Sequence, residues 1–413
     1  MADYDMVIAG AGIIGVSCAL WARMRGLRVL LADPNPPGSG TSSGNACTLA
    51  TYACLPVNDP SVLRSLPSLM LSGDSPLGVS YAHALKNPRW MLAFLANCRA
   101  APSARIAGHL AALMAQADDG LDPLIEAAGA QDLVEARGQL NIWSTAAGAA
   151  AAEAGLQRRR ALGVAWREVS PREAQAMEPG LKLPIQRAVH FHQARHLRNP
   201  QALIARMHQR FSDLGGSSMT APVEAVQAGQ DRVTVTVDGQ RLSADHAVIA
   251  AGAYSGRIPG AGTADLPLGT ERGYHLMFQG EAHRVTRPVG WAEGGFYAVP
   301  HADGLRLAGT VEIAGLDAPV NRQRLDYLAR RGAEMLGPLP APSSEWLGRR
   351  PTMPDSLPVL GHSAQSPRLL YAFGHQHVGL TLGGLTGRLI ADLAQGRDPG
   401  LDLAPFAASR RYA

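Results

Sequence analysis

The sequence predicts an α/β fold in which two domains are interwoven, and three observations support this prediction. The chain has 413 residues, which is too long for one compact hydrophobic core. Near the N-terminus, an apolar run leads through a glycine-rich turn into a helix and then into a second apolar strand. Further along, Val233, Val235 and Val237 alternate with polar residues, which is the pattern of a strand with one buried face.

The glycine-rich turn follows the strand predicted over residues 4–9 and reads Gly10-Ala11-Gly12-Ile13-Ile14-Gly15. The first glycine, Gly10, permits a tight turn, and Gly12 lets the backbone approach a pyrophosphate. Gly15 lets the following helix, predicted over 16–25, pack close to the strand. This spacing in this context predicts a Rossmann-type dinucleotide-binding unit.

Two features outside the turn complete this unit. The amides at the helix N-terminus, next to Ile14, are expected to hold the phosphates, because the partial positive charge there favours anions. The second strand, predicted over 28–32, ends at Asp33, which is placed to accept hydrogen bonds from ribose hydroxyls.

The rest of the chain favours FAD over a nicotinamide nucleotide. A flavoprotein that takes electrons from NADPH usually needs a second glycine turn, and Gly260-Ala261-Gly262 lacks both a preceding strand and a third glycine. An apolar strand from Asp245 runs into small residues at Ala251 and Gly252, which let the chain pass close under a dinucleotide. The preceding strand, predicted over 220–226 and containing Val223, is placed to cover an adenine. The alternative is an ordinary sheet strand.

Composition excludes several other classes. Lys and Arg total 38 against 34 Asp and Glu, and this excess is spread along the chain, so no nucleic-acid partner is expected. The four cysteines form no CxxC pair, and no signal sequence or membrane-spanning run is present. We therefore expect a reduced cytoplasmic protein, with peripheral contact to the inner face of the cell membrane left open. No oligomeric state follows from the sequence.

With these residues in place, the chain resembles the FAD-dependent amino acid oxidoreductases, a family that includes D-amino acid dehydrogenase, glycine oxidase and sarcosine oxidase. The resemblance is strongest to the bacterial D-amino acid dehydrogenases. One block that carries it is Thr41-Ser42-Ser43-Gly44-Asn45-Ala46. The resemblance implies that this block lies against the flavin and its phosphates, for which hydroxyls and free amides are suited.

The remaining blocks imply the substrate side of the site. Glu271-Arg272-Gly273-Tyr274-His275 resembles the strand that carries substrate-facing residues, and Tyr274 is expected to orient a carboxylate or cover the flavin. Gly348-Arg349-Arg350-Pro351 resembles the most specific block, in which the arginine before the proline reaches over the flavin. That residue is Arg350, and a planar guanidinium with paired donors suits a carboxylate.

The last block runs from Tyr371 to Leu382 and is followed by a helix predicted from Gly384 towards Leu393. Together they resemble the closing strand, loop and helix of the family. Its expected cofactor contacts are Gly374, Gly379, Leu380 and Thr381, and the amides there can stabilise a reduced flavin. A substrate-facing side chain is expected at His375 or His377, and His377 is the one selected. Some relatives attach flavin through a cysteine in the C-terminal half, but no cysteine follows Cys98, so non-covalent FAD is expected.

Other polar residues receive weaker interpretations. His190, His192 and His196 lack a further ligand of suitable spacing, so ordinary packing is favoured and no metal is expected. His301 and Glu312 are further candidates for the pocket. The FAD-binding domain is expected over 1–85, 175–255 and 345–413, and the substrate domain, on a mixed or antiparallel sheet, over 86–174 and 256–344.

The resemblance implies oxidation of a small D-amino acid by hydride transfer from Cα to flavin N5. A cyclic substrate such as D-proline or hydroxy-D-proline fits this subgroup, and a quinone or another non-oxygen compound is the expected electron acceptor. Three alternatives remain open. They are an O2-using oxidase of the amine, glycine or sarcosine type, a flavin subunit of a larger dehydrogenase complex, and a flavin hydroxylase that uses NADPH.

Overall fold

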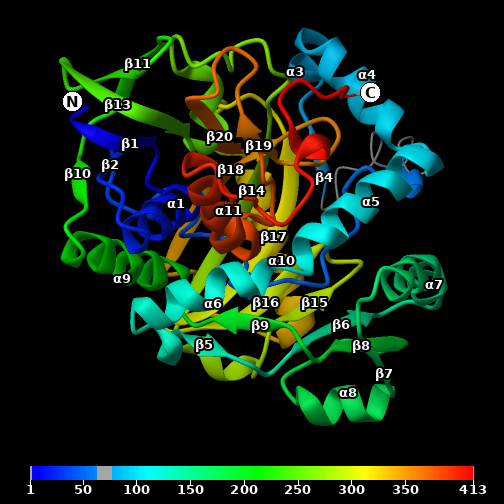
Figure 1. Cartoon of the computed structure of the whole chain (residues 1–413). Coiled ribbons are helices and arrows are strands. Elements are labelled where there is room, and N and C mark those ends of the chain that lie inside the picture. Colours follow the sequence, from blue (N-terminus) through cyan, green and yellow to red (C-terminus); the bar gives the residue numbers. More distant parts are fainter. Residues whose placement is uncertain (1, 63–76, 413) are drawn as a thin grey trace.

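The computed structural model describes residues 2–62 and 77–412 and contains two large β-sheets with helices packed around them (Figure 1). The first sheet has eight strands. Its order is β10-β2-β1-β13-β12-β11, and β20 pairs with both β13 and β19. The bounds are β1 Tyr4–Ala9, β2 Val29–Ala32, β10 Ser217–Met219, β11 Val223–Ala228, β12 Val233–Val237, β13 Gln240–Ile249, β19 Val359–His362 and β20 Leu369–Phe373.

The long strand β13 gives this sheet two parts. Its second half lies between β1 and β20 in parallel register, and β2 and β10 continue the parallel part beyond β1. Its first half pairs antiparallel with β12, which in turn pairs with β11. Buried parallel strands are apolar on both faces, which explains the uninterrupted apolar runs in β1 and β2.

Alternate residues of β1 face two different cores. Met6 and Ile8 pack against helices, whereas Val7 and Ala9 pack with residues of β12 and β20. The helices on the first face are α1 Ile13–Met24, α6 Ala117–Ala127, α9 Pro200–Asp213 and α11 Gly379–Ala394. α11 lies between α1 and α6, and α9 packs on the other side of α1 (Figure 1).

Glycines allow α11 to approach its neighbours closely. A Cβ added at Gly387 would lie 2.6 Å from the backbone of Ser17 in α1, and one at Gly384 would lie 2.4 Å from Cα of Leu121 in α6. Contacts this short exclude any side chain at these positions. The glycine content of α11 therefore reflects packing of three helices over the nucleotide-binding edge.

The second sheet has nine strands in the order β18-β14-β17-β16-β15-β6-β8-β7, and β4 pairs with β17. It is mixed, because β15–β6 and β17–β4 are parallel pairs and the others are antiparallel. The bounds are β4 Leu77–Val79, β6 Gln139–Trp143, β7 Arg167–Val169, β8 Arg187–Phe191, β14 Gly269–Gln279, β15 Val289–Trp291, β16 Phe296–His301, β17 Gly304–Ile313 and β18 Ser344–Thr352.

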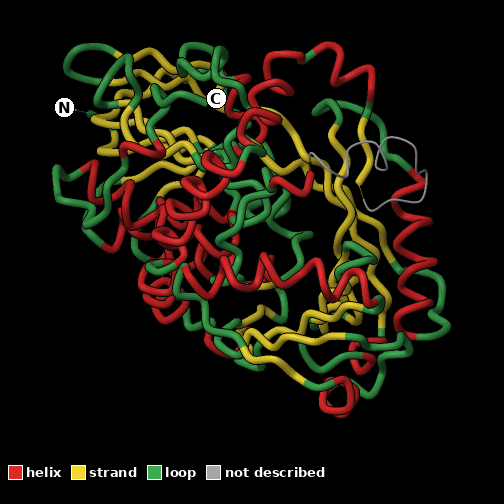
Figure 2. The backbone as a smooth tube through the Cα atoms, turned by 90° about the vertical axis from the view of Figure 1, so that its right-hand side faces the viewer, coloured by secondary structure: helices red, strands yellow, loops and turns green. Residues whose placement is uncertain are grey.

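Helix α10, Arg322–Leu336, packs on β14 and β17, where Leu325 and Leu328 contribute to the same core as Leu276 and Leu307. A small third sheet, β3-β9-β5, joins three short strands, Thr48–Leu49, Arg195–Leu197 and Val134–Glu135. Figure 2 shows the two large sheets and the helices from the side. The remaining helices are α3 Tyr81–Lys86, α4 Pro88–Asn97, α5 Ala100–Met114, α7 Ala146–Ala161 and α8 Pro171–Met177.

The predicted α/β class with a mixed second sheet is confirmed. Sheet membership differs from the expected segments in three places, because β4, β8 and β18 all belong to the second sheet. Strand neighbours can be distant in the chain, as Glu271 of β14 and Arg350 of β18 are. Composition therefore does not reveal which segments join the same sheet. Element ends also shift, since α1 begins at Ile13 rather than residue 16, and α11 at Gly379 rather than residue 384. Among the described residues, no helix combines the length and apolar character needed to cross a bilayer.

We expect Gly387→Ala to lower the free energy of unfolding by about 1–3 kcal/mol, because the new methyl group meets backbone atoms of α1. Gly108→Ala is the matched control. Gly108 is exposed in α5 with open space around it, so alanine there should stabilise the helix by about 0.5–1 kcal/mol. Urea denaturation of both variants measures the effect. Equal stabilities would show that Gly387 does not set the α1–α11 distance.

Candidate functional site

The glycine turn between β1 and α1 is shaped by two close contacts. Gly10 has φ +107°, and a Cβ there would lie 2.5 Å from the carbonyl oxygen of Ala250. A Cβ at Gly15 would lie 1.7 Å from the carbonyl oxygen of Gly10. Helix α1 therefore begins directly above the ends of β1 and β13, and Gly12, at its N-cap, offers no side-chain cap.

Asp33 and Ser42 both lie against this turn. One oxygen of the Asp33 carboxylate accepts a hydrogen bond from the Ala11 amide at 2.8 Å, and the other accepts one from the Asn35 amide. The Ser42 hydroxyl accepts from the Ile13 amide at 3.0 Å. The structure thus brings together the glycine turn, the acid after β2 and the first hydroxyl-rich block, as predicted for a dinucleotide cradle.

The small-residue turn after β13 lies beside the same cradle. Ala250 donates to the Ala9 carbonyl at 2.8 Å, and Gly252 has φ +57° at the start of a short 3₁₀ helix, Gly252–Arg257. Ala251 precedes this helix as its N-cap. Val223 is the first residue of β11 and lies four positions beyond Met219, whose carbonyl accepts from the Asp33 amide.

The backbone of the 43–46 loop is oriented by the second sheet. Arg306 of β17 donates to the carbonyls of Ser43 and Asn45, each at 2.9 Å. The Nδ1 atom of His275 in β14 lies 2.9 Å from the carbonyl oxygen of Gly44. Within residues 2–62 and 77–412, the amides of Gly44, Asn45 and Ala46 make no hydrogen bond. Side chains of the second sheet thus bind the three successive carbonyls of residues 43–45. The amides of residues 44–46 are left available to an electron-rich ligand.

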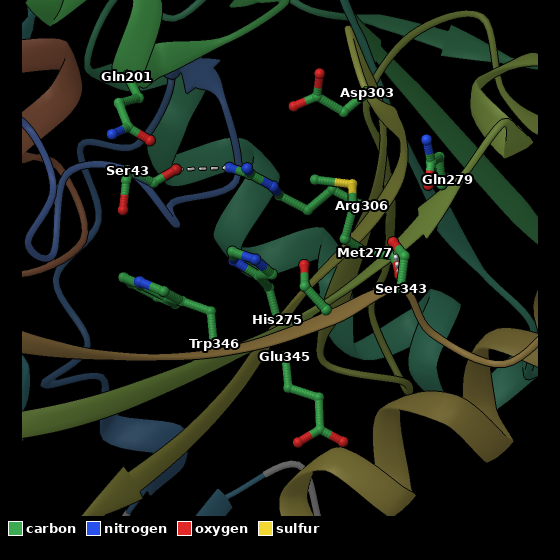
Figure 3. A pocket seen from close by; sticks show the side chains of 11 residues that line it. Ser43, Gln201, His275, Met277, Gln279, Asp303, Arg306, Ser343, Glu345 and Trp346 are labelled. Atoms are coloured by element: carbon green, nitrogen blue, oxygen red, sulfur yellow. Dashed lines mark hydrogen bonds between the residues drawn. The ribbon is translucent and has the colours of Figure 1, made fainter.

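Figure 3 shows Arg306 reaching from the second sheet towards Ser43. Its side chain is 5% exposed and also contacts His301 Nε2 at 3.2 Å. Burial and the charge of Arg306 lower the pKa of both His275 and His301 to about 3, so both imidazoles are neutral. A cavity of about 410 Å³ is lined by Ser43, Arg306 and His275, and also by Trp346. The ring of Trp346 stacks on that of His275.

The side chains of Thr41 and Asn45 form hydrogen bonds with backbone atoms in and around the same loop. The Thr41 hydroxyl donates to the Arg349 carbonyl at 3.0 Å and so links the loop to β18. The Asn45 side chain accepts from the Cys47 amide and donates to the Ser42 carbonyl. These contacts fix the loop against both sheets.

The guanidinium of Arg350 lies across Gly273 of the neighbouring strand. A Cβ at Gly273 would lie 2.4 Å from Nη2 of Arg350, so glycine is required for this placement. Glu271 is directly opposite Arg350 in the β14–β18 register. The guanidinium makes no hydrogen bond or ion pair with any described residue. Its donors are therefore available for a ligand.

Burial perturbs both charged groups of this pair. The pKa of Arg350 is lowered by burial, which Glu271 and Tyr297 partly oppose, and the pKa of Glu271 is raised by burial, which Arg350 partly opposes. A sheltered guanidinium beside a carboxyl of reduced acidity is a suitable receptor for a further carboxylate, because little solvent competes for its donors.

His377 is exposed and lies close enough to Arg350 for the guanidinium charge to act on it, whereas His375 is buried. Surrounding protein atoms and the Arg350 charge lower the pKa of His377 to about 4, although its side chain keeps exposed area. The ring is therefore exposed to solvent and within reach of the Arg350 charge. His375 is buried, and its Nε2 lies 2.9 Å from the Thr386 hydroxyl inside α11. Of the two histidines, His377 is the exposed one, and it stays the candidate for a contact with substrate.

Tyr274 lies on the other face of β14 and is not brought together with Arg350. Its ring is 1% exposed, and its hydroxyl donates to Glu312 at 2.6 Å and accepts from the Asn321 amide. Its interior position and Glu312 raise its pKa to about 12. Glu312 is likewise engaged with Arg272 at 3.1 Å. Both residues support the core of the second sheet.

The sequence interpretation did not identify Tyr297 and Tyr52. Tyr297 of β16 acts electrostatically on Arg350 and on Tyr52, and its ring lies over Gly290, where a Cβ would come within 2.7 Å. The Tyr52 hydroxyl donates to Gln139, whose amide donates to Asn141. The only signal in the sequence is that Tyr52 follows the 41–46 block and that Tyr297 lies in the hairpin-rich segment.

The last block closes the site from the C-terminal side. Gly374 has φ +85°, and a Cβ there would meet Met353 at 3.1 Å. Gly379 begins α11, and Leu380 and Thr381 in its first turn are buried, with the Thr381 hydroxyl accepting from the Ala50 amide at 2.9 Å. Over the residues that the structure describes, no three His, Cys, Asp or Glu side chains are grouped to hold a metal ion.

We expect Arg306→Met to weaken FAD binding by tenfold or more, because the 43–46 loop loses two charge-assisted hydrogen bonds worth about 1.5–3 kcal/mol each. Arg322→Met, which removes an exposed pair with Glu345, is the control and should change little. Titration of the apoprotein with FAD gives the dissociation constants. A stability loss without any change in FAD affinity would contradict this role of Arg306.

Comparison with known proteins agrees with this geometry. The family model for FAD dependent oxidoreductases matches residues 5–393. A D-amino-acid oxidase from Bradyrhizobium diazoefficiens is 33% identical over 98% of this chain and 98% of that protein. A D-amino acid dehydrogenase 2 from Ralstonia nicotianae is 28% identical over 98% of this chain and all of that protein.

Solved structures show the same fold. Glycine oxidase from Geobacillus kaustophilus superposes with a TM-score of 0.75 at 23% identity and covers both chains completely. The cradle fits the cofactor of this family, because the crowded glycines at 10 and 15 and the free amides of the 44–46 segment suit a dinucleotide and a flavin. The chain belongs to the family of FAD-dependent oxidoreductases and is an FAD-dependent amino acid oxidoreductase.

Proposed function

We propose that the protein oxidises the carbon–nitrogen bond of a small D-amino acid and passes the electrons to a quinone or another non-oxygen acceptor. The observation that carries the substrate class is Arg350, a sheltered guanidinium whose donors have no partner among the described residues. A carboxylate bound there would lie near Glu271, Tyr297 and His377. The proposal of D-configuration is supported by the relatives named D-amino-acid oxidase and D-amino acid dehydrogenase.

Bound FAD, held non-covalently, supplies the redox chemistry by accepting a hydride from the substrate. The protein supplies position. Arg350 fixes the carboxylate, and the neutral ring of His377 leaves no second positive charge to repel the substrate amine. Tyr297 is close enough to the guanidinium to act on its charge. Holding the substrate in this way provides most of the rate in such a reaction.

A small cyclic D-amino acid, of the D-proline or hydroxy-D-proline type, is the specific substrate that we propose. Peripheral contact with the inner face of the cell membrane is also part of the proposal, since a quinone acceptor is lipid-soluble. The second candidate is an O2-using oxidase. It is favoured by the relative named D-amino-acid oxidase and by the solved glycine oxidase.

An anaerobic panel of D- and L-amino acids, with D-proline and hydroxy-D-proline included, tests the substrate. One D-amino acid should bleach the oxidised-flavin absorbance, while its L-enantiomer should not. Reoxidation by a soluble quinone should then be faster than reoxidation by air. Bleaching by the L-enantiomer alone would refute the D-configuration, and rapid peroxide formation in air would favour the oxidase.

Arg350→Met should raise KM for the substrate by about tenfold to a hundredfold, because a carboxylate loses paired charge-assisted donors. Flavin absorbance should stay unchanged. Arg349→Met is the control, since that side chain donates to the Leu316 carbonyl and should leave KM near the wild-type value.

Removing Arg350 alone leaves the buried Glu271 without its compensating charge, so this variant could lose stability. The double variant Arg350→Met/Glu271→Gln removes both charges and separates folding from binding. If the double variant is stable and still saturates normally, Arg350 does not hold the substrate carboxylate.

A further inference from the structure

One face of the molecule carries positive charge without acidic neighbours in sequence. It comprises α3, α4, α5 and the end of the chain, which lie at one corner of the molecule (Figure 1). The Asn97 side chain donates to the Tyr412 carbonyl at 2.6 Å, which ties the end of the chain to α4. From residue 77 to residue 116 the sequence contains no Asp or Glu. We call this surface the basic face. Its exposed cations are Lys86, Arg89, Arg99, Arg105 and Arg411.

These cations differ from most other arginines of the protein. Within the described residues, none of the five forms an ion pair, whereas arginines elsewhere are commonly paired, as Arg187 is with Glu153 and Glu168. The carboxylate of Asp355, which lies next to this face, is already bound by Arg410 at 2.6 Å. Within the described part of the chain, the five cations of the basic face are therefore not neutralised by ion pairs.

Large apolar side chains project from the same helices. Trp90 and Phe94 stack on each other on the inner side of α4, and Trp90 packs against Gly269 of β14. Leu92 lies on the opposite side of this helix and is 68% exposed, and Leu85 at the end of α3 is 81% exposed. Exposed leucines among unpaired cations are typical of helices that lie in a membrane interface.

A hollow of about 430 Å³ opens within the basic face. Arg105, His109, Arg410 and Arg411 line it, together with Asp355, Leu357 and Pro405. Burial and the Arg105 charge lower the pKa of His109, and the nearby Asp402 partly opposes this shift. Arg410 is already bound to Asp355 and to backbone carbonyls, whereas Arg105 and Arg411 form no ion pair with a described residue. These two arginines suit the phosphate group of a lipid, because guanidinium groups bind phosphate through paired donors.

We propose that the basic face binds an anionic lipid bilayer, with Leu85 and Leu92 entering the interface and the arginine-lined hollow holding a lipid phosphate. Charge and apolar groups act together here, which a nucleic acid or a free phosphate would not require. This inference rests on the membrane contact included in the proposed function and assigns that contact to the basic face. Flotation is measured without amino acid, so its outcome does not depend on which substrate the protein oxidises.

Flotation of the holoenzyme with vesicles tests this proposal. Wild-type protein should float with vesicles of phosphatidylcholine and phosphatidylglycerol and not with phosphatidylcholine alone. Arg89→Glu/Arg105→Glu and Leu85→Ser/Leu92→Ser should each reduce the bound fraction by about tenfold or more. The control, Met24→Ser/Arg232→Glu, changes an exposed apolar residue and an exposed cation elsewhere and should bind like wild type.

Every variant should keep the flavin spectrum and the reduction by amino acid of the wild type, which separates membrane binding from the catalytic proposal. Absence of flotation with anionic vesicles would overturn the inference, as would equal binding by the leucine variant. Flotation in the presence of inorganic phosphate, at matched ionic strength, distinguishes a lipid phosphate from a free phosphate ion. If phosphate displaces the protein while the leucine variant still binds normally, the hollow is a site for small anions and the bilayer proposal is wrong.

Discussion

The contact between Arg306 and the 43–46 loop is the interaction on which the site depends. It joins a strand of the second sheet to the loop that follows the nucleotide-binding turn, and it binds the carbonyls of Ser43 and Asn45. A buried cation is costly unless its donors are used, and here backbone carbonyls use them. The same contact therefore sets the orientation of the loop amides and the relative position of two sheets.

A second constraint is the balance of charge around Arg350. Glu271 is directly opposite it in the sheet, yet the guanidinium forms no ion pair with it. The pair is close enough for each charge to affect the other, and far enough apart to leave the arginine donors free. Gly273 makes this arrangement possible, because any side chain there would displace the guanidinium.

The arginines near the amino acid site and the cations of the basic face differ in how they are paired. In the second sheet and beside it, Arg349 is bound to a carbonyl, and Arg272 and Arg287 are bound to carboxylates, and these contacts fix loops and strands. On the basic face, the cations form no ion pair with any described carboxylate and lie near exposed leucines. A protein that neutralises its arginines in one region and leaves them unpaired in another presents a surface suited to an anionic partner.

The sequence by itself determined the nucleotide cradle, because that signal is local. Gly10 and Gly15 are required by backbone contacts within one turn and its neighbouring strand, and β1 spans the predicted residues 4–9. The resemblance directed attention to Arg350 and to the pair His375 and His377, and only the structure separated the two histidines. Tertiary structure also decided the roles of Arg306, Tyr297 and Tyr274. Each of these depends on which face of a strand is buried and on partners that are distant in the chain, and the order of residues alone records neither.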